Sequence, residues 1–399
     1  MSGLTRQEVA ERADVEVAYV DQLLAVAVLT PDSAGSLTAD DVKRAGIMRS
    51  LQDAGLPLDG IANGLRQGVL SLDFVTSVEY SRFTGISDET FEAASVRTGV
   101  PLPLLTMIRE AIGLGSANPK DRLREHELAV IPFVQMQLRM GFRPAAIERF
   151  LRALGDSLRR IAESESEWWR TEVIEPRLAA GVDPSLVGQP EGSADLTRVS
   201  DEALMAIYHA QQQQTWTSNI AAGFEALLAR AGLYEAPDRP PAICFLDITG
   251  YTRLTQERGD RAAAELAELL TPIVKRTSIE HGGRPVKWLG DGVMIWFRDP
   301  GPAVVAALEM VDALDRAGLP PAHVGIHSGP VVVQQGDYYG QTVNMASRIA
   351  DYARPGEVLV SQTVVNAASV GGVTFTDIGA VELKGVAGAV GLHAARRAG

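Results

Sequence analysis

Apolar residues recur at intervals of three and four positions through the first 190 residues, and strand-like alternation is scarce there. This spacing gathers apolar side chains on one face of a helix, so residues 1–190 are predicted to be almost wholly helical. Thr38-Ala39-Asp40-Asp41 has the residue types that begin a helix, and Gly55 followed by Pro57 has those that end one. The pattern therefore predicts an all-α N-terminal domain.

The N-terminal region also contains two similar segments. Ala54–Ile61 resembles Met140–Ile147, with Gly55 and Gly141 lying 86 positions apart. Upstream, Ala13-Asp14-Val15 resembles Thr98-Gly99-Val100 at an offset of 85 positions. A small helical unit that cannot bury its apolar face alone is stabilised by stacking on a copy of itself. We predict an internal repeat with halves 8–67 and 91–153; the alternative is a chance match between two helix-turn-helix segments.

The segment after residue 182 changes in composition. Residues 183–199 are rich in glycine, proline, serine and aspartate, which is typical of a connector. Ser200-Asp201-Glu202 then begins a helical pattern that runs to about Gly232, and the proline-rich residues 236–241 end it because proline cannot continue a helix. We predict a linker over 191–241 that contains a coupling helix at 200–232.

From residue 242 onward, short apolar runs alternate with helical patterns. Asp291-Gly292 lies between two apolar runs, which predicts a β-hairpin. The predicted order is strand 242–247, helix 259–280, strands 285–288 and 293–297, helix 302–316, strands 323–327 and 331–334, helix 342–352 and strand 358–361. Strand-helix-strand-strand-helix-strand is the ferredoxin-like order, so we predict an α+β domain over 242–399.

Composition and charge limit the classes of function. The chain has 399 residues, 46% hydrophobic and 22% charged, an ordinary balance for a soluble protein. Its single cysteine, Cys244, lies in an apolar run; it excludes an intrachain disulfide and favours a reducing compartment. No signal peptide and no apolar run long enough to span a bilayer is found, so we expect a cytoplasmic location.

The net charge of −13 is distributed unevenly. Residues 1–240 carry 23 Lys+Arg and 34 Asp+Glu, whereas residues 241–399 carry 14 and 16. The net charge is therefore −11 over residues 1–240 and −2 over residues 241–399. Binding of nucleic acid requires clustered cations, so a nucleic-acid partner is not expected.

Two carboxylates in the C-terminal region are candidate metal ligands. Asp247 follows the apolar run at 242–247, and Asp291 lies at the predicted hairpin tip. If this strand lies beside the hairpin, both carboxylates meet at one edge of the sheet, where they suit Mg²⁺ or Mn²⁺ bound together with substrate phosphates. Two such ions can activate an attacking oxygen and stabilise a leaving one. The alternative is that Asp247 is an ordinary turn or cap residue.

A second polar pair lies further along the chain. Asn344 and Arg348 are four positions apart and therefore share one face of a helix. An arginine there can bind phosphate oxygens, and an asparagine can hold a ribose or a phosphate. The alternative for this pair is a solvated polar stripe.

Taken together, residues 242–390 resemble the class III nucleotide cyclase catalytic domain. Five motifs carry the resemblance: Phe245-Leu246-Asp247-Ile248-Thr249-Gly250-Tyr251-Thr252, Lys287-Trp288-Leu289-Gly290-Asp291, Gly325-Ile326-His327-Ser328-Gly329-Pro330, Gly340-Gln341-Thr342-Val343-Asn344-Met345-Ala346-Ser347-Arg348 and Leu383-Lys384-Gly385. Tyr251 stands where the family commonly has phenylalanine, so an aromatic residue is kept.

The resemblance implies roles for the metal-binding and base-reading residues of the site. Asp247 and Asp291, with the main-chain carbonyl of Ile248, are expected to bind two Mg²⁺ or Mn²⁺ ions per site. Lys287 and Asp337 are expected to read the edge of the base. A lysine donates to a ring acceptor and a carboxylate accepts from an exocyclic amine, a pattern that fits adenine and is opposite to that of guanine. ATP is therefore the expected substrate.

The same resemblance implies how the reaction proceeds. Asn344 is expected to orient the ribose, Arg348 to stabilise charge on the transferred phosphate, and Lys384 to contact the triphosphate. The ribose 3′-oxygen would attack the α-phosphorus, giving cyclic AMP and pyrophosphate, as in an adenylate cyclase, a phosphorus–oxygen lyase. In this family each site lies between two catalytic domains, so we expect a homodimer with two composite sites.

The layout also resembles bacterial two-domain cyclases in which a helical N-terminal domain regulates catalysis. A proton or a small apolar ligand is a candidate signal, and His209, on the predicted coupling helix, is a candidate pH sensor. The alternative is that His209 is an ordinary helix residue. Residues 4–67 weakly resemble the start of mercury-resistance-type (MerR) regulators, a DNA-binding interpretation that the charge opposes.

Two interpretations from different classes follow. One is an active adenylate cyclase with a regulatory helical domain. The other is a non-catalytic nucleotide sensor that uses the cyclase fold to control a helical effector domain, including a DNA-binding one. A degenerate sensor is expected to have lost several of its six polar site residues, whereas this chain carries them all.

Overall fold

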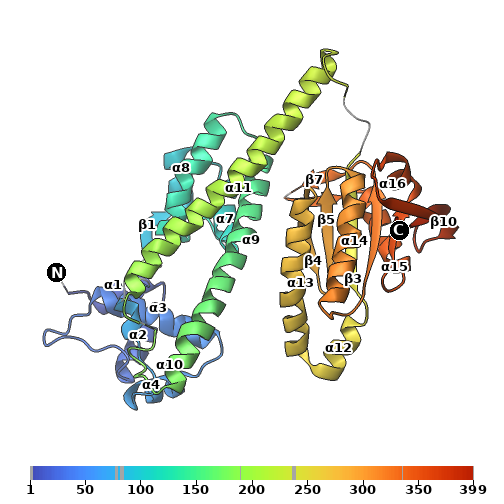
Figure 1. Ribbon diagram of the computed structural model, residues 1–399. Helices are drawn as coiled ribbons and strands as arrows, with labels where there is room; N and C mark the ends of the chain where they lie inside the picture. Colours follow the sequence, from blue (N-terminus) through green and yellow to red (C-terminus); the bar gives the residue numbers. More distant parts are fainter. Residues whose placement is uncertain are drawn as a thin grey trace. The chain divides into compact units, whose positions relative to one another are not determined.

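The computed structural model describes residues 3–76, 80, 85–188, 190–235, 240–334 and 336–398. The chain divides into two compact units, Met1–Asn219 and Ile220–Gly399, and the division falls within the long helix α11 (Figure 1). None of the helices in the described part of the chain combines the length and the apolar character that a membrane crossing requires.

The first unit is helical, as predicted. Its elements are α1 (Arg6–Ala13), α2 (Val17–Ala25), α3 (Ala39–Asp53), α4 (Leu58–Arg66), η1 (Asp73–Thr76), β1 (Ile86–Thr90), α6 (Phe91–Thr98), α7 (Leu102–Ala111), β2 (Arg122–Arg124), α8 (Glu125–Arg139), α9 (Pro144–Trp169), the π-helical turn η2 (Arg170–Ile174), α10 (Glu175–Ala179) and most of α11 (Ser193–Arg230). The short antiparallel pair β1–β2 was not predicted. Its strands are separated by two helices in the sequence, and tertiary packing rather than local alternation sets the pairing.

Helix ends follow the capping rules of the sequence. The Thr38 side chain accepts from the N–H of Asp41, and the Asp41 carboxylate accepts from the N–H of Thr38, so the predicted start of α3 is confirmed. The predicted stop is confirmed too, with Gly55 at a φ of 93° two residues after α3. The long helix begins earlier than predicted, because residues 193–199, which we assigned to a connector, form its first two turns.

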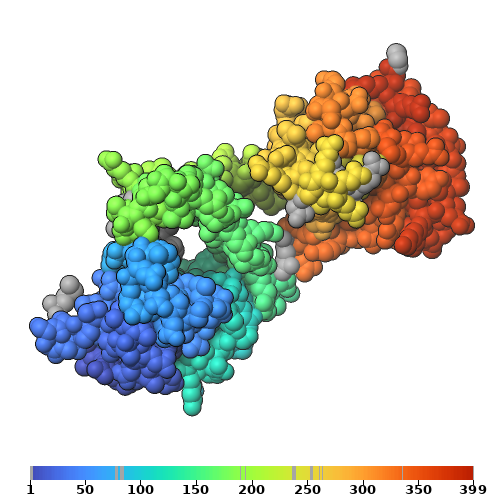
Figure 2. Space-filling view, turned by 90° about the horizontal axis from the view of Figure 1, so that it is seen from below, coloured from blue at the N-terminus to red at the C-terminus, as the bar shows by residue number. Residues whose placement is uncertain are grey.

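The first unit contains two series of elements in the same order. α1, α2, α3 and α4 begin 85, 85, 86 and 86 positions before α6, α7, α8 and α9. Thr5 and Thr90 cap the first helices, and the buried carboxylates of Asp41 and Glu127 each accept from the N–H of the N-cap residue of their helix. Each series has its own apolar core. Figure 2 shows the first series in dark blue beside the second in lighter blue and teal, and α1 contacts β1.

The second unit is built on a seven-stranded mixed sheet. Its elements are β3 (Ala242–Ile248), α12 (Tyr251–Arg258), α13 (Asp260–Glu280), β4 (Gly283–Leu289), β5 (Gly292–Phe297), α14 (Pro300–Arg316), β6 (Ala322–Ser328), β7 (Val332–Gln334), β8 (Asp337–Tyr339), α15 (Gln341–Tyr352), β9 (Val358–Ser361), α16 (Gln362–Ala367), β10 (Val373–Glu382) and β11 (Ala389–Arg397). The strand order is β10-β11-β9-β6-β3-β5-β4, and β7–β8 forms a separate hairpin.

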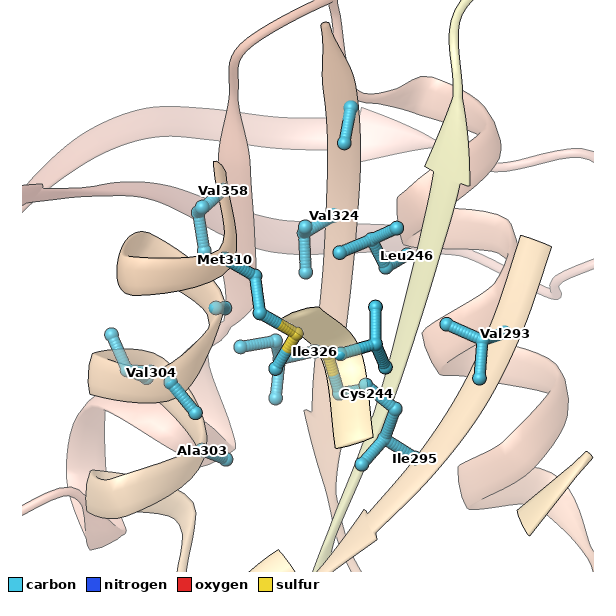
Figure 3. Close-up of a cluster of buried hydrophobic side chains, with 14 of the residues drawn as sticks. Cys244, Leu246, Val293, Ile295, Ala303, Val304, Met310, Val324, Ile326 and Val358 are labelled. Carbon is cyan, nitrogen blue, oxygen red and sulfur yellow. The ribbon is translucent and has the colours of Figure 1, made fainter. Parts of the chain in front are cut away.

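The predicted ferredoxin-like core is present. The four strands β6-β3-β5-β4 lie in that order, and β3 pairs antiparallel with both β5 and β6. Helices α13 and α14 cover one face, where Cys244 and Leu246 of β3 pack among apolar side chains that include Met310 of α14 (Figure 3). Burial of each large aliphatic side chain contributes about 2 kcal/mol to the free energy of folding. The opposite face is covered by α15 and by the β7–β8 hairpin.

Candidate active site

The turn between β4 and β5 places Asp291 beside the end of β3. The two-residue turn consists of Gly290 and Asp291, with Leu289 paired to Gly292, so the predicted Asp-Gly tip is shifted by one residue. Gly290 has a φ of 68°, which favours glycine in the first turn position. Position 292 favours glycine for a different reason, because a Cβ there would lie 3.0 Å from Asp247 Oδ1.

Asp247 and Asp291 form a pair of interacting carboxylates. Burial raises the pKa of Asp247, the charge of Asp291 raises it further, and the nearby His323 acts in the opposite direction. A divalent cation relieves this repulsion, and two carboxylates with a main-chain carbonyl and substrate phosphates are ligands that Mg²⁺ and Mn²⁺ accept. Within the described ranges, no cluster of three or more His, Cys, Asp or Glu side chains is arranged for a metal ion.

Lys287 and Asp337 meet although they are 50 positions apart. Lys287 Nζ, on β4, donates to Asp337 Oδ2, on β8, at 2.5 Å. Burial acts to raise the pKa of Asp337, but hydrogen bonds from Lys287 and from the N–H of Tyr338 outweigh it, so this pKa lies below its ordinary value. The pair presents an ionised acceptor beside a donor, as recognition of an adenine edge requires.

Helix α15 carries the two predicted residues Asn344 and Arg348. They lie one turn apart; Asn344 is exposed, and Arg348 Nη1 donates to Asp351 Oδ2 at 2.7 Å. Asp351 is close enough to Asp247 for its charge to contribute to the raised pKa of Asp247. Helix α15 packs against β3 and β6, and Arg348 is held by a carboxylate of its own helix.

Of the three remaining predicted residues, Ile248 ends β3 directly after Asp247, whereas Lys384 and His209 lie elsewhere in the chain. Lys384 is exposed between β10 and β11. His209 is exposed on α11 in the first unit, with its ring 5.9 Å from that of Tyr208. Among the described residues Lys384 forms no hydrogen bond or ion pair with Asp247, Asp291 or Lys287, and His209 belongs to the other unit.

Sequence reasoning missed His323, which lies against a predicted metal ligand. It is the direct partner of Asp247 across the β3–β6 ladder, and its Nε2 lies 3.5 Å from Asp247 Oδ2. Its Nδ1 lies 3.2 Å from Thr249 Oγ1. The 76 positions between Asp247 and His323 gave no local signal, because strand register alone brings them together.

Comparisons with known proteins identify the family of the C-terminal domain. The family model for the adenylate and guanylate cyclase catalytic domain matches residues 233–394. A protein of Streptomyces coelicolor named adenylate cyclase is 27% identical over 275 residues, 68% of this chain and 68% of its own. A protein of Mycobacterium tuberculosis named pH-sensitive adenylate cyclase is 27% identical over 334 residues, 78% of this chain and 79% of its own.

The solved structures similar to this chain include that of the adenylyl cyclase CyaB from P. aeruginosa. The two sequences are 24% identical, and the match covers 40% of this chain and 95% of the CyaB chain with a TM-score of 0.36. The family match coincides with the seven-stranded sheet and includes every predicted site residue of the second unit. Residues 233–394 therefore form a class III adenylate and guanylate cyclase catalytic domain.

Proposed function

We propose that the protein is an adenylate cyclase that converts ATP to cyclic AMP and pyrophosphate. The observation that carries this proposal is the contact between Lys287 Nζ and Asp337 Oδ2. Lysine donates to the ring nitrogen of adenine and the carboxylate accepts from its exocyclic amine, whereas guanine presents a carbonyl and a ring N–H there. The named function of the curated relatives supports the same reaction.

Asp247, Asp291 and the Ile248 carbonyl would hold two Mg²⁺ or Mn²⁺ ions. When bound, these ions supply activation of the ribose 3′-hydroxyl and neutralisation of the triphosphate charge. The interacting carboxylates support this assignment, because burial and the neighbouring charge raise the pKa of Asp247 when no cation is near. The chain's own residues then bind and orient the nucleotide, and no protein nucleophile is needed.

We further propose that two chains share each site. Lys287 and Asp337 would read the base in one site, while Asp247 and Asp291 of the same chain would serve the other. From the chain that reads the base, Asn344 would orient the ribose and Arg348 would stabilise charge on the α-phosphate, and Lys384 would contact the triphosphate. Arg348 would either break its hydrogen bond with Asp351 or bind the phosphate as well, because a guanidinium has five N–H donors. A symmetric homodimer would hold two such sites.

One assay tests the proposed activity directly. Purified protein is incubated with ATP and Mn²⁺ or Mg²⁺, and cyclic AMP is measured, with GTP as the competing substrate. We expect cyclic AMP with ATP, little cyclic GMP with GTP, and loss of activity in Asp291→Ala. The matched control is Asp312→Ala, whose exposed side chain pairs with Arg397 on β11. Absence of cyclic AMP with both ions would refute the proposed function.

The N-terminal region is proposed to regulate this activity. The proposed arrangement is a duplicated helical domain over 1–190, with halves 8–67 and 91–153, a linker with a coupling helix over 191–241 and a catalytic domain over 242–399. The two matching series of helices support the duplication. Glu225, near the end of α11, accepts from Arg298 at 2.5 Å, which supports a role for this helix in coupling. Comparing activity with and without residues 1–200 tests the regulation.

A proton and a small apolar ligand are both proposed as signals. His209→Ala should flatten the pH–activity profile if His209 senses pH, and an unchanged profile would refute that role. An apolar ligand has a candidate location in the first unit. An open hollow of about 670 Å³ lies between α9 and α11, where Ile161 and Trp168 expose 45% and 46% of their surface. Substitution of Trp168 by Ala tests this location.

A further inference from the structure

Strand β4 contains an irregularity between the two cations Arg284 and Lys287. Arg284 pairs with Trp296 of β5 and Lys287 pairs with Met294, and the register shifts between Pro285 and Lys287. In a regular strand, residues three positions apart point to opposite faces of the sheet. One extra residue, a β-bulge, cancels this alternation and turns both side chains to the same face. The bulge thus directs Arg284 and Lys287 toward the β7–β8 hairpin.

Arg284 forms a compact cluster with two aromatic residues on that face. Its Nη2 donates to Tyr338 Oη at 2.5 Å. The guanidinium carbon lies 5.3 Å from the ring centroid of Trp296 and 5.7 Å from that of Tyr338. The two rings stack with centroids 6.0 Å apart and planes 23° apart. Cation–π attraction and a charge-assisted hydrogen bond therefore act on the same tyrosine.

Tyr338 is the anchor of the β7–β8 hairpin. The described residues of the hairpin form a two-stranded sheet of their own, and Tyr338 is only 4% exposed and packs with Ile243, Met294 and Trp296 on the face of the seven-stranded sheet. Asp337 directly precedes Tyr338, and Asp337 Oδ1 accepts from the N–H of Tyr338 at 2.8 Å. Any shift of Tyr338 therefore moves Asp337 relative to Lys287.

We propose that Arg284 is a positioning residue for recognition of the base. By clamping Tyr338 against Trp296, it holds Asp337 at hydrogen-bonding distance from Lys287 and fixes the spacing of donor and acceptor that an adenine edge requires. Arg284 acts through Tyr338 and need not touch the nucleotide. This inference rests on the proposed function, because it assigns the Lys287–Asp337 pair to base recognition.

Two substitutions separate the contribution of the Arg284 charge from that of the Tyr338 hydroxyl. Arg284→Met keeps an unbranched side chain over Trp296 but removes the charge and the donors, and Tyr338→Phe removes only the hydroxyl. Arg284→Lys is the conservative variant and should restore part of the function. Arg261→Met on α13 is the control, because that arginine is exposed and its ion pair is with Glu265, one turn along its own helix.

The steady-state kinetics with ATP and GTP give the first readout. In Arg284→Met we expect KM for ATP to rise about tenfold with little change in kcat, and the preference for ATP over GTP to fall about tenfold. Tyr338→Phe should change both quantities in the same direction by a smaller factor, and Arg261→Met should match the wild type. Loss of kcat with an unchanged ATP-to-GTP preference would overturn the proposal, because a general structural defect gives that result.

Hydrogen exchange of the β7 and β8 amides gives a second readout that needs no turnover. Exchange at residues 332–334 and 337–339 should be faster in Arg284→Met and Tyr338→Phe than in the wild type and Arg261→Met. Unchanged exchange together with an unchanged nucleotide preference would refute the clamp. If the wild type makes no cyclic AMP, the proposed function fails, but the exchange rates still decide whether Arg284 holds the hairpin.

Discussion

Asp247 on β3 and His323 on β6 are direct cross-strand neighbours, with His323 Nε2 3.5 Å from Asp247 Oδ2. The His323 side chain is only 16% exposed, and Thr249 Oγ1 lies 3.2 Å from its other ring nitrogen. His323 thus lies between the Thr249 hydroxyl and the Asp247 carboxylate. Such an arrangement orients a carboxylate that binds metal, as neighbouring hydrogen-bonding groups do at many metal sites.

The first prediction concerns metal affinity. His323→Ala should raise the Mn²⁺ concentration needed for half-saturation roughly tenfold, because Asp247 loses the group that orients it. Mn²⁺ binding is measured by electron paramagnetic resonance in the presence of a non-hydrolysable ATP analogue. His281→Ala is the control, since His281 pairs with Glu309 of α14. Equal Mn²⁺ affinity in wild type and His323→Ala would contradict this role.

The second prediction concerns the single cysteine. Cys244 is fully buried within β3, and burial raises the pKa of its thiol to about 12. At pH 8 roughly one thiol in ten thousand would be ionised, and only the thiolate reacts. The native protein should therefore resist a chromogenic disulfide reagent for hours and react with one equivalent after denaturation. Rapid labelling of the native protein would show that β3 opens readily.

The third prediction concerns pH and stability. Burial lowers the pKa of His327, whose Nδ1 lies 2.8 Å from Ser361 Oγ. The unfolded chain then takes up a proton more readily than the folded one, so this stabilising contribution is complete above the unfolded pKa of about 6.5 and is lost as pH falls below it. His327→Asn should have a melting temperature that decreases less between pH 7.5 and 5.5 than that of the wild type. An equal decrease would exclude His327 as a cause.

The fourth prediction concerns the two matching halves of the first unit. Asp41 accepts from the N–H and hydroxyl of Thr38, and Glu127, which is fully buried, accepts from the N–H of Arg124 and from Arg109. Asp41→Asn should destabilise the first unit by about 1 kcal/mol through the weakened cap. Glu127→Gln should cost about 3 kcal/mol, because the mostly buried Arg109 loses its nearest carboxylate and keeps only Asp121, at 3.4 Å.

Thermal unfolding measures both substitutions. Asp40→Asn is the control, because it lies beside Asp41 on α3 but is exposed and pairs at the surface with Lys43. If Asp40→Asn lowered the melting temperature as much as Asp41→Asn, the loss of stability would not come from the capping hydrogen bonds of Asp41. An unchanged melting temperature in Glu127→Gln would contradict the proposed equivalence of Glu127 and Asp41 in the two halves.

Local patterns were sufficient to predict several elements of both units. The apolar run at 242–247, the amphipathic helix at 259–280 and the capping residues of α3 depend on neighbours in the sequence, and all three elements are present. The predicted proximity of Lys287 and Asp337 came from a family resemblance, and their contact bridges 50 positions.

The features that sequence reasoning missed depend on strand register. His323 contacts Asp247 because of the register in which β3 and β6 pair. The bulge after Pro285 determines which face of the sheet the following side chains point to. No local periodicity encodes either feature. The early start of α11 was missed for a different reason. Glycine, proline and serine are frequent in residues 183–192, and this composition concealed the helical residues 193–199 that follow.

The most direct test of the account mixes two inactive chains. Asp291→Ala removes a proposed metal ligand and Arg348→Ala removes the proposed transition-state cation, so each homodimer should be inactive. In an equal mixture about half of the dimers are heterodimers with one intact site, and about one quarter of the wild-type rate of cyclic AMP formation should return. A mixture that stays as inactive as its parents, despite confirmed heterodimers, would contradict the shared site.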